Sequence, residues 1–341
     1  MTDPIEVNFS IRQGDHLAMI LYIIYIEPLL LYLEKTLLGL RSFSFSQLVE
    51  AYCDDVNVLT DSEEDLLTVD LVVSKFEKLS GAILSRNNKC KIMGLGRWKG
   101  KQDWPLNYVK TEEELKIFGI IFKESYRDMV KTNWIYRYDK FDRCLMSWAT
   151  RNLPSLTSRV EVVRHYALSR IYYVASILPI NKTMVKKIEG LTGKFVWKGW
   201  LLRVSIEEAK NPTSKGGLNL VCVHSMCNSL LISQFLRLLM NSDKKSLFLV
   251  AYWIGDSFCD LLPGLNFSPR LTNIPEYFSY IESLLIVSKT SGLITGSNWR
   301  FITNRMLYKD KASSFPIPKI ELDIGYSYRN AWFFLNLPAF S

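Results

Sequence analysis

The stretch LVEAYCDDVNVLT, residues 48–60, contains the most informative pattern of this sequence. Apolar residues flank the adjacent carboxylates Asp54 and Asp55, and Val56 and Val58 alternate with Asn57. Alternation with a period of two is typical of a strand with one buried face. The stretch therefore predicts a β-hairpin whose turn carries the two aspartates.

Helical segments are predicted on both sides of this hairpin. Downstream, Ser62 with Asp65 three residues later approximates a capping box, an apolar helical pattern follows, and Ser80-Gly81 ends it. Upstream, residues 17–38 form a long apolar pattern that predicts a helix with a kink at Pro28. Glu27 and Pro28 interrupt this pattern, so it is too short to span a bilayer, and we predict no membrane association.

Further elements follow from the rest of the pattern. Residues 89–95 and 114–122 predict one strand each, and residues 128–200 predict three helices separated by Pro154 and Pro179. Another helix is predicted over residues 223–240. The fold class is therefore α+β: a small antiparallel sheet with packed helices, followed by a mostly helical region.

The adjacent carboxylates indicate a chemistry. Two carboxylates at close range repel each other by a few kcal/mol at an effective protein dielectric (about 20). A site that keeps both ionised usually holds a divalent cation, and open carboxylate positions suit Mg²⁺, with Mn²⁺ as an alternative. Two such ions position a 3′-hydroxyl and stabilise a pyrophosphate leaving group. The alternative is a polar turn without a metal, since Asp is common in turns.

Composition limits the partners. The chain has 341 residues and a formal net charge of +8, which suits a polyanion such as nucleic acid or merely solvated basic faces. The six cysteines are scattered, which fits a reducing compartment and predicts an intracellular protein, cytoplasmic or nuclear. Cys222, His224 and Cys227 come closest to a metal cluster, but we predict no zinc site.

Several segments together resemble the reverse transcriptase of LINE-type, non-LTR retrotransposons. Residues 11–18 resemble the family's Arg-Gln-Gly-x-Pro-Leu segment, Ala51 to Asp55 its Tyr-Ala-Asp-Asp box, and residues 76–82 its Phe…Ser-Gly helix end. Phe118-Gly119-Ile120 resembles the Leu-Gly strand of the primer grip. Later matches follow in the family's order, so the resemblance covers about residues 5–240; they are Ser158-Arg159-Val160, Arg170 to Tyr173, Phe195 to Gly199 and Gly216 to Leu220.

The resemblance implies an RNA-directed DNA polymerase with an RNA template, a DNA primer and dNTPs as partners. It implies metal-binding and catalytic roles for Asp54 and Asp55, and primer-grip roles for Phe118 and Gly119. The residues implied to contact nucleotide or template are Arg12, Gln13, Gly14, Tyr52 and Lys89. A basic run is expected to follow a nucleic-acid backbone or to be a solvated loop face; it comprises Arg86, Lys89, Lys91, Arg97, Lys99 and Lys101.

The sequence also departs from the family. The family's catalytic palm has a further aspartate on a strand well upstream of Gln13-Gly14, and Asp3 and Glu6 are too close to Arg12 to match it. The family's fingers also have no match here. We therefore expect a truncated polymerase that is inactive alone, with a partial palm over residues 1–123, a helical thumb over 124–210 and a helical connection region over 211–341. The alternatives are a non-catalytic nucleic-acid-binding module and a helical interaction protein.

Overall fold

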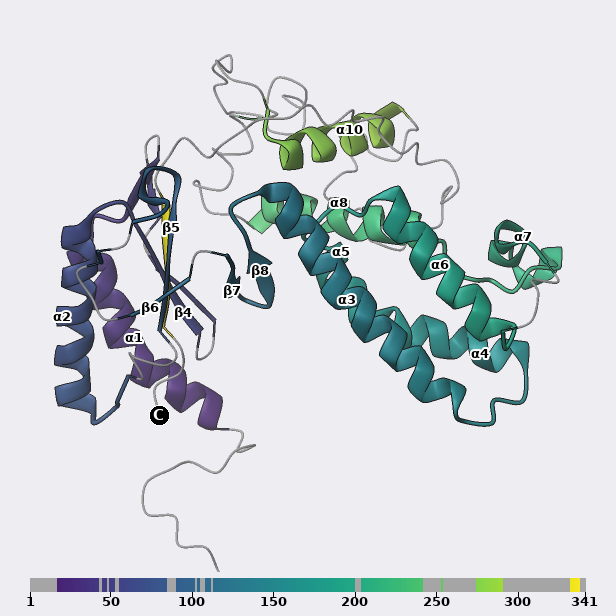
Figure 1. Cartoon of the computed structure of the whole chain (residues 1–341), viewed down its shortest axis with the longest axis horizontal. Helices are drawn as coiled ribbons and strands as arrows, with labels where there is room; N and C mark the ends of the chain where they lie inside the picture. Colours follow the sequence, from purple (N-terminus) through teal and green to yellow (C-terminus); the bar gives the residue numbers. More distant parts are fainter. Residues whose placement is uncertain are drawn as a thin grey trace, which may run out of the picture. The chain divides into compact units, whose positions relative to one another are not determined.

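The computed structural model describes residues 17–42, 45–47, 49–52, 55–84, 90–101, 103–104, 108–111, 113–199, 204–241, 253, 274–290 and 332–337 (Figure 1). The chain forms two compact units by its internal contacts. Unit 1 comprises residues 1–129 and 326–341, and unit 2 comprises residues 130–325. Assignment of these units to palm, thumb and connection stays a prediction.

Unit 1 is built on a five-stranded sheet with the strand order β3-β4-β9-β5-β6. The strands are β3 (Val49–Tyr52), β4 (Asp55–Thr60), β5 (Lys91–Leu95), β6 (Val109–Lys110) and β9 (Trp332–Leu337). β9 pairs antiparallel with both β4 and β5, whereas β5 and β6 are parallel. The C-terminal region, which was expected to be helical, thus supplies a central strand of the sheet.

Two helices lie side by side against one face of this sheet (Figure 1). They are α1 (Ala18–Thr36), which contains Pro28, and α2 (Glu63–Ser80). Ser62 caps α2 by accepting a hydrogen bond from the Asp65 amide, and Gly81 ends the helix in the left-handed conformation, which confirms both predicted signals. Buried side chains of α1, α2, β4 and β5 form one apolar core, including Leu29, Val58, Val69 and Ile92.

One buried carboxylate joins three of these elements. The Asp65 side chain accepts hydrogen bonds from the Leu38 and Gly39 amides and from the Thr60 hydroxyl, at 3.1, 2.9 and 2.8 Å. Leu38 and Gly39 follow the end of α1, Thr60 ends β4, and Asp65 itself lies in the first turn of α2. The carboxylate therefore fixes the end of α1 to the junction between β4 and α2.

The outer surface of the helical layer is unusually apolar. Large apolar side chains are exposed along α1 and α2; they include Leu17, Ile20, Ile24, Leu31, Leu67, Leu71 and Leu79. Exposed apolar surface on this scale makes self-association a hazard for an isolated chain.

The remaining elements of unit 1 are two hairpins and one short helix. The hairpins are β1 (Leu40–Ser42) with β2 (Phe45–Gln47), and β7 (Leu115–Ile117) with β8 (Ile120–Phe122); the helix is the 3₁₀ turn η1 (Gly96–Trp98). The prediction of one continuous strand over residues 114–122 was wrong, because Phe118 and Gly119 form a turn between β7 and β8.

Unit 2 is helical throughout its described residues. Its elements are α3 (Tyr126–Ala149, whose first four residues belong to unit 1), α4 (Leu156–Val162), the π-helix η2 (Val163–Ala167), α5 (Ser169–Ala175), α6 (Lys182–Val196), α7 (Ile206–Lys210), the 3₁₀ turn η3 (Thr213–Lys215), α8 (Val223–Asn241) and α10 (Glu276–Thr290). Pro154 and Pro179 separate three helical stretches, as predicted. The Trp134 indole donates a hydrogen bond of 2.8 Å to the Pro179 carbonyl in the core.

Within the described residues, no helix has the length and apolar character needed to cross a membrane.

Candidate active site

The predicted hairpin is formed by β3 and β4. The two strands are antiparallel, with Val49 opposite Val58 and Tyr52 opposite Asp55. Tyr52 therefore ends β3 and Asp55 begins β4, and residues 53 and 54 connect them. Tyr52 is 71% exposed and Asp55 is half-buried. Cys53 and Asp54 lie outside the described residues.

The face of the sheet on which Asp55 lies follows from the burial of its neighbours. Val56 and Val58 belong to the core beneath α1 and α2. Successive side chains of a strand point to opposite faces, so Asp55 and Asn57 point away from these helices. On β5, Ile92 belongs to the same helix-side core, and Met93 belongs to a second apolar cluster on the opposite face. Asp55 and Met93 thus share that opposite face.

The β7–β8 hairpin lies against this opposite face. Leu115 and Ile117 pack with Met93 and Leu95, and in Figure 1 the hairpin lies on the side of the sheet away from α1 and α2. Its two-residue turn has positive φ at both Phe118 (47°) and Gly119 (79°), as a type I′ turn requires. Because Phe118 has a Cβ atom, this left-handed conformation costs it roughly 1–2 kcal/mol of free energy.

An aromatic contact joins the two hairpins. The rings of Tyr52 and Phe118 lie edge to face, with 6.1 Å between their centroids and 70° between their planes. Such pairs contribute about 0.5–1.5 kcal/mol beyond the area that they bury. The structure therefore brings together the end of the predicted catalytic hairpin and the predicted primer grip. The motifs did not predict this contact, although the aromatic residue beside each turn was visible in the sequence.

The donor set suits a divalent cation only in part. Asp55 offers the hard carboxylate oxygens that Mg²⁺ prefers, at a half-exposed position. A single carboxylate is too few, and Asp54 lies outside the described residues. The described part of the chain contains no group of three His, Cys, Asp or Glu side chains that could hold a metal ion.

Other predicted contact residues fall outside the described part of the chain. These are Arg12, Gln13, Gly14 and Lys89. Three lysines of the basic run, Lys91, Lys99 and Lys101, lie within the described residues, and two of them have acidic partners. Lys99 pairs with Glu124 at 2.8 Å, and Lys101 pairs with Glu63 and lies 4.7 Å from the Trp98 ring centroid. These two lysines support the solvated-loop alternative rather than contact with a phosphate backbone.

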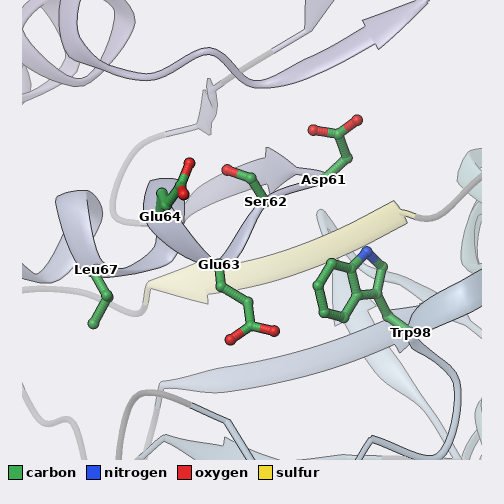
Figure 2. A pocket seen from close by; sticks show the side chains of 6 residues that line it. All are labelled: Asp61, Ser62, Glu63, Glu64, Leu67 and Trp98. Carbon is green, nitrogen blue, oxygen red and sulfur yellow. The ribbon is translucent and has the colours of Figure 1, made fainter.

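A shallow depression lies at the far end of β4 from Asp55. It is lined by Asp61, Ser62, Glu63, Glu64, Leu67 and Trp98. Figure 2 shows the Glu63 carboxylate pointing to one side of the chain and those of Asp61 and Glu64 to the other. The carboxylates do not converge, and their negative charge would repel a nucleic acid. This depression is therefore not a candidate for the polymerase site.

The Cys222 and His224 side chains contact neighbours at the start of α8. The Cys222 thiol lies 3.2 Å from the Ser225 hydroxyl, and His224 Nε2 lies 3.1 Å from Asn228 Nδ2. Cys227 is fully buried, which raises the pKa of its thiol. Burial, followed by the positive charges of nearby lysines, lowers the pKa of His224.

Comparison with known proteins connects the chain with a transposon. Over 251 aligned positions, this chain is 26% identical to the Transposon TX1 uncharacterized 149 kDa protein of Xenopus laevis. The match covers 70% of this chain and 18% of that protein, so the chain spans less than a fifth of the relative's length. No protein-family profile matches the chain. The similarity supports the transposable-element origin that the retrotransposon-like motifs predicted.

Proposed function

We propose that the chain supplies the palm hairpin, the primer grip and the helical thumb of a retrotransposon reverse transcriptase, an RNA-directed DNA polymerase. The observation that carries the proposal is the contact between Tyr52 and Phe118. These residues lie 66 positions apart in the sequence, and the resemblance assigned them separately to the catalytic box and to the primer grip. The similarity to a transposon protein supports the retrotransposon origin on which the proposal rests.

The proposed site uses the face of the sheet opposite α1 and α2. A primer strand that lies along the Phe118-Gly119 turn would bring its 3′ end toward Tyr52 and Asp55, because the two aromatic rings are in contact. Asp54 and Asp55 would hold Mg²⁺ or Mn²⁺, which would activate the 3′-hydroxyl and stabilise the pyrophosphate leaving group. Tyr52, with its exposed ring, would contact the terminal primer or template nucleotide.

Photo-cross-linking tests where the primer end lies. A primer–template duplex with 4-thiothymidine at the primer 3′ end is bound to the 341-residue chain and irradiated, and cross-linked peptides are mapped by mass spectrometry. We expect cross-links within residues 49–58 and 115–122. Tyr52→Ala and Phe118→Ala should each reduce them. The matched control is Tyr32→Ala, which removes an exposed ring from α1. Cross-links that are insensitive to Tyr52 and Phe118 would refute the proposed site.

Primer extension tests catalysis. No residue of this sequence matches the family's upstream aspartate, which bridges both metal ions, and positioning and charge stabilisation carry nearly all of phosphoryl-transfer catalysis. We therefore expect no extension by the 341-residue chain alone with either Mg²⁺ or Mn²⁺. Robust extension that Asp54→Asn abolishes would support the polymerase and overturn its expected inactivity.

A further inference from the structure

Arg151, Trp148 and Tyr166 lie in contact, one after another, on the surface of unit 2, and are here called the stack. The guanidinium carbon of Arg151 lies 4.4 Å from the centroid of the Trp148 ring. The Trp148 ring in turn lies 4.7 Å from the Tyr166 ring, with 46° between their planes. Arg151 is exposed, and half of the Tyr166 surface remains accessible. An arginine over an aromatic face, beside a second accessible ring, is a surface on which an unpaired base can stack.

The backbone places Tyr166 in this stack by an unusual turn. Residues 163–167 form the π-helix η2, in which the Leu168 amide donates a 2.9 Å hydrogen bond to the Val163 carbonyl. Val163 and Ala167 stay buried while Tyr166 is exposed. Single π-turns are rare and occur frequently at functional sites. The π-turn thus places the exposed Tyr166 beside Trp148.

The stack continues as a row along two antiparallel helical segments. Tyr173 lies seven residues beyond Tyr166, and its ring centroid is 5.7 Å from the Arg137 guanidinium. On α3, Arg137 lies eleven residues before Trp148. Eleven residues make three helical turns plus a rotation of about 20°, and they span about 16 Å along the helix axis. Both pairs therefore lie on the same side of α3, with the buried side chain of Phe141 between them.

The charges along the row favour an anion. Arg137, Arg151 and Arg170 carry exposed or half-exposed positive charge along it. Glu161, the acidic residue of α4, is paired with Arg164 at 2.8 Å and with His165 at 2.9 Å.

The acidic residues of α3 near the row point elsewhere. Asp139 and Asp142 are rotated from Arg137 by about 200° and 140° around the helix axis, at 3.6 residues per turn. The carboxylates of Asp139 and Asp142 therefore repel a phosphate bound at the row only weakly. The arginines of the row can thus approach a phosphate backbone.

We propose that this row is a binding site for single-stranded nucleic acid, in which the accessible ring of the Trp148–Tyr166 pair stacks on a base and the arginines contact phosphates. A duplex does not fit, because its base faces are already stacked within the helix. The proposal uses no residue of the β3–β4 or β7–β8 hairpins. It holds whether or not the chain catalyses polymerisation, and a failed primer extension does not affect it.

Fluorescence anisotropy with labelled oligo(dT) and oligo(U) strands tests the site on the 341-residue chain. Removing one stacking ring should weaken binding of both strands about tenfold or more, so we expect this loss in Trp148→Ala and in Tyr166→Ala. Trp148→Phe and Tyr166→Phe keep a ring and should retain most of the affinity. Met146→Ala, an exposed apolar position about 160° away on α3, should bind like the unmodified chain.

Salt and base content separate stacking from general charge attraction. Arg151→Ala should reduce the slope of log affinity against log salt by about 0.7, the effect of one phosphate contact on a single strand, whereas Trp148→Ala should leave the slope unchanged. An abasic strand should bind equally to the unmodified chain and to Trp148→Ala. Circular dichroism and thermal melting establish that each variant is folded. Folded Trp148→Ala and Tyr166→Ala variants that bind oligo(dT) undiminished would overturn the proposal, as would an equal loss with the abasic strand.

Discussion

Replacing Asp65 with alanine should destabilise unit 1 more than most single substitutions. Asp65 is 4% exposed, and its side chain accepts three hydrogen bonds, from the Leu38 and Gly39 amides and the Thr60 hydroxyl. Alanine removes both carboxylate oxygens and with them all three hydrogen bonds. The Thr60 hydroxyl keeps its contact with the Ser62 carbonyl at 3.4 Å, but the Gly39 amide would be left buried without an acceptor.

The magnitude follows from the type of each bond. A hydrogen bond to a charged group contributes about 1.5–3 kcal/mol, and a buried donor left without a partner costs about 1–3 kcal/mol. Water can reach the Leu38 amide more easily, because its bond is only partly buried. We therefore expect Asp65→Ala to lower the free energy of unfolding by about 3–5 kcal/mol. Asp65→Asn keeps one acceptor oxygen and should cost about half as much.

Native-state hydrogen exchange read by mass spectrometry measures this effect locally. Peptides that cover residues 33–42 should lose protection in Asp65→Ala, and urea unfolding followed through the same peptides gives the free energy. The matched control is Glu64→Ala, which also removes a carboxylate from the first turn of α2 but at an exposed position. The reasoning is refuted if the free energies of unfolding of Asp65→Ala and Glu64→Ala differ by less than about 1 kcal/mol, because a typical surface substitution costs no more than that.

Three further predictions concern unit 2. Gly217→Ala should destabilise it by about 1–3 kcal/mol, because an added Cβ would lie 2.1 Å from the Asn211 carbonyl oxygen, whereas Gly190→Ala meets nothing within 4 Å and should be neutral or stabilising; urea unfolding compares the two. Burial lowers the pKa of His224, so the folded state binds fewer protons than the unfolded state below pH 6.5; the melting temperature should fall as the pH falls from 7 to 5, and less so in His224→Gln. Burial raises the pKa of Tyr277 from 10.0 to about 12, so the unfolded state alone ionises between these values; stability should fall by up to about 3 kcal/mol as the pH rises through that window, and absorbance at 295 nm should show this tyrosine ionising late.

Local signals predicted the elements that frame the site. Ser62 and Gly81 bound α2 because a cap needs only a side chain or a permissive backbone within a few residues. Pro154 and Pro179 separate helices because proline lacks the amide that a helix needs. The hairpin of residues 48–60 was visible because alternation and turn residues both lie within a short window. These features depend only on residues close in the sequence, so a short sequence pattern is enough to predict them.

Features that depend on distant partners were not predicted. β9 enters the sheet between β4 and β5 from more than 230 positions away, and no local pattern specifies that pairing. The contact between Tyr52 and Phe118 has the same origin. The turn at Phe118-Gly119 was missed for another reason: Gly119 signals a turn, but the apolar residues on both sides of it favoured a continuous strand.

The alternation in β4 links the fold to the candidate site. Val56 and Val58 are buried between the sheet and the two helices, and this burial forces Asp55 and Asn57 onto the opposite face. A shift of the strand by one residue would exchange the two sets and bury the Asp55 carboxylate against the apolar core, at a cost far above that of any single lost contact. The same valines that stabilise unit 1 therefore orient the aspartate toward the face that carries the β7–β8 hairpin. This alternation preserves the geometry of the hairpin whether or not the chain carries out any chemistry, so the position of Asp55 does not by itself establish a polymerase. The cross-linking and extension experiments are the tests of polymerase function.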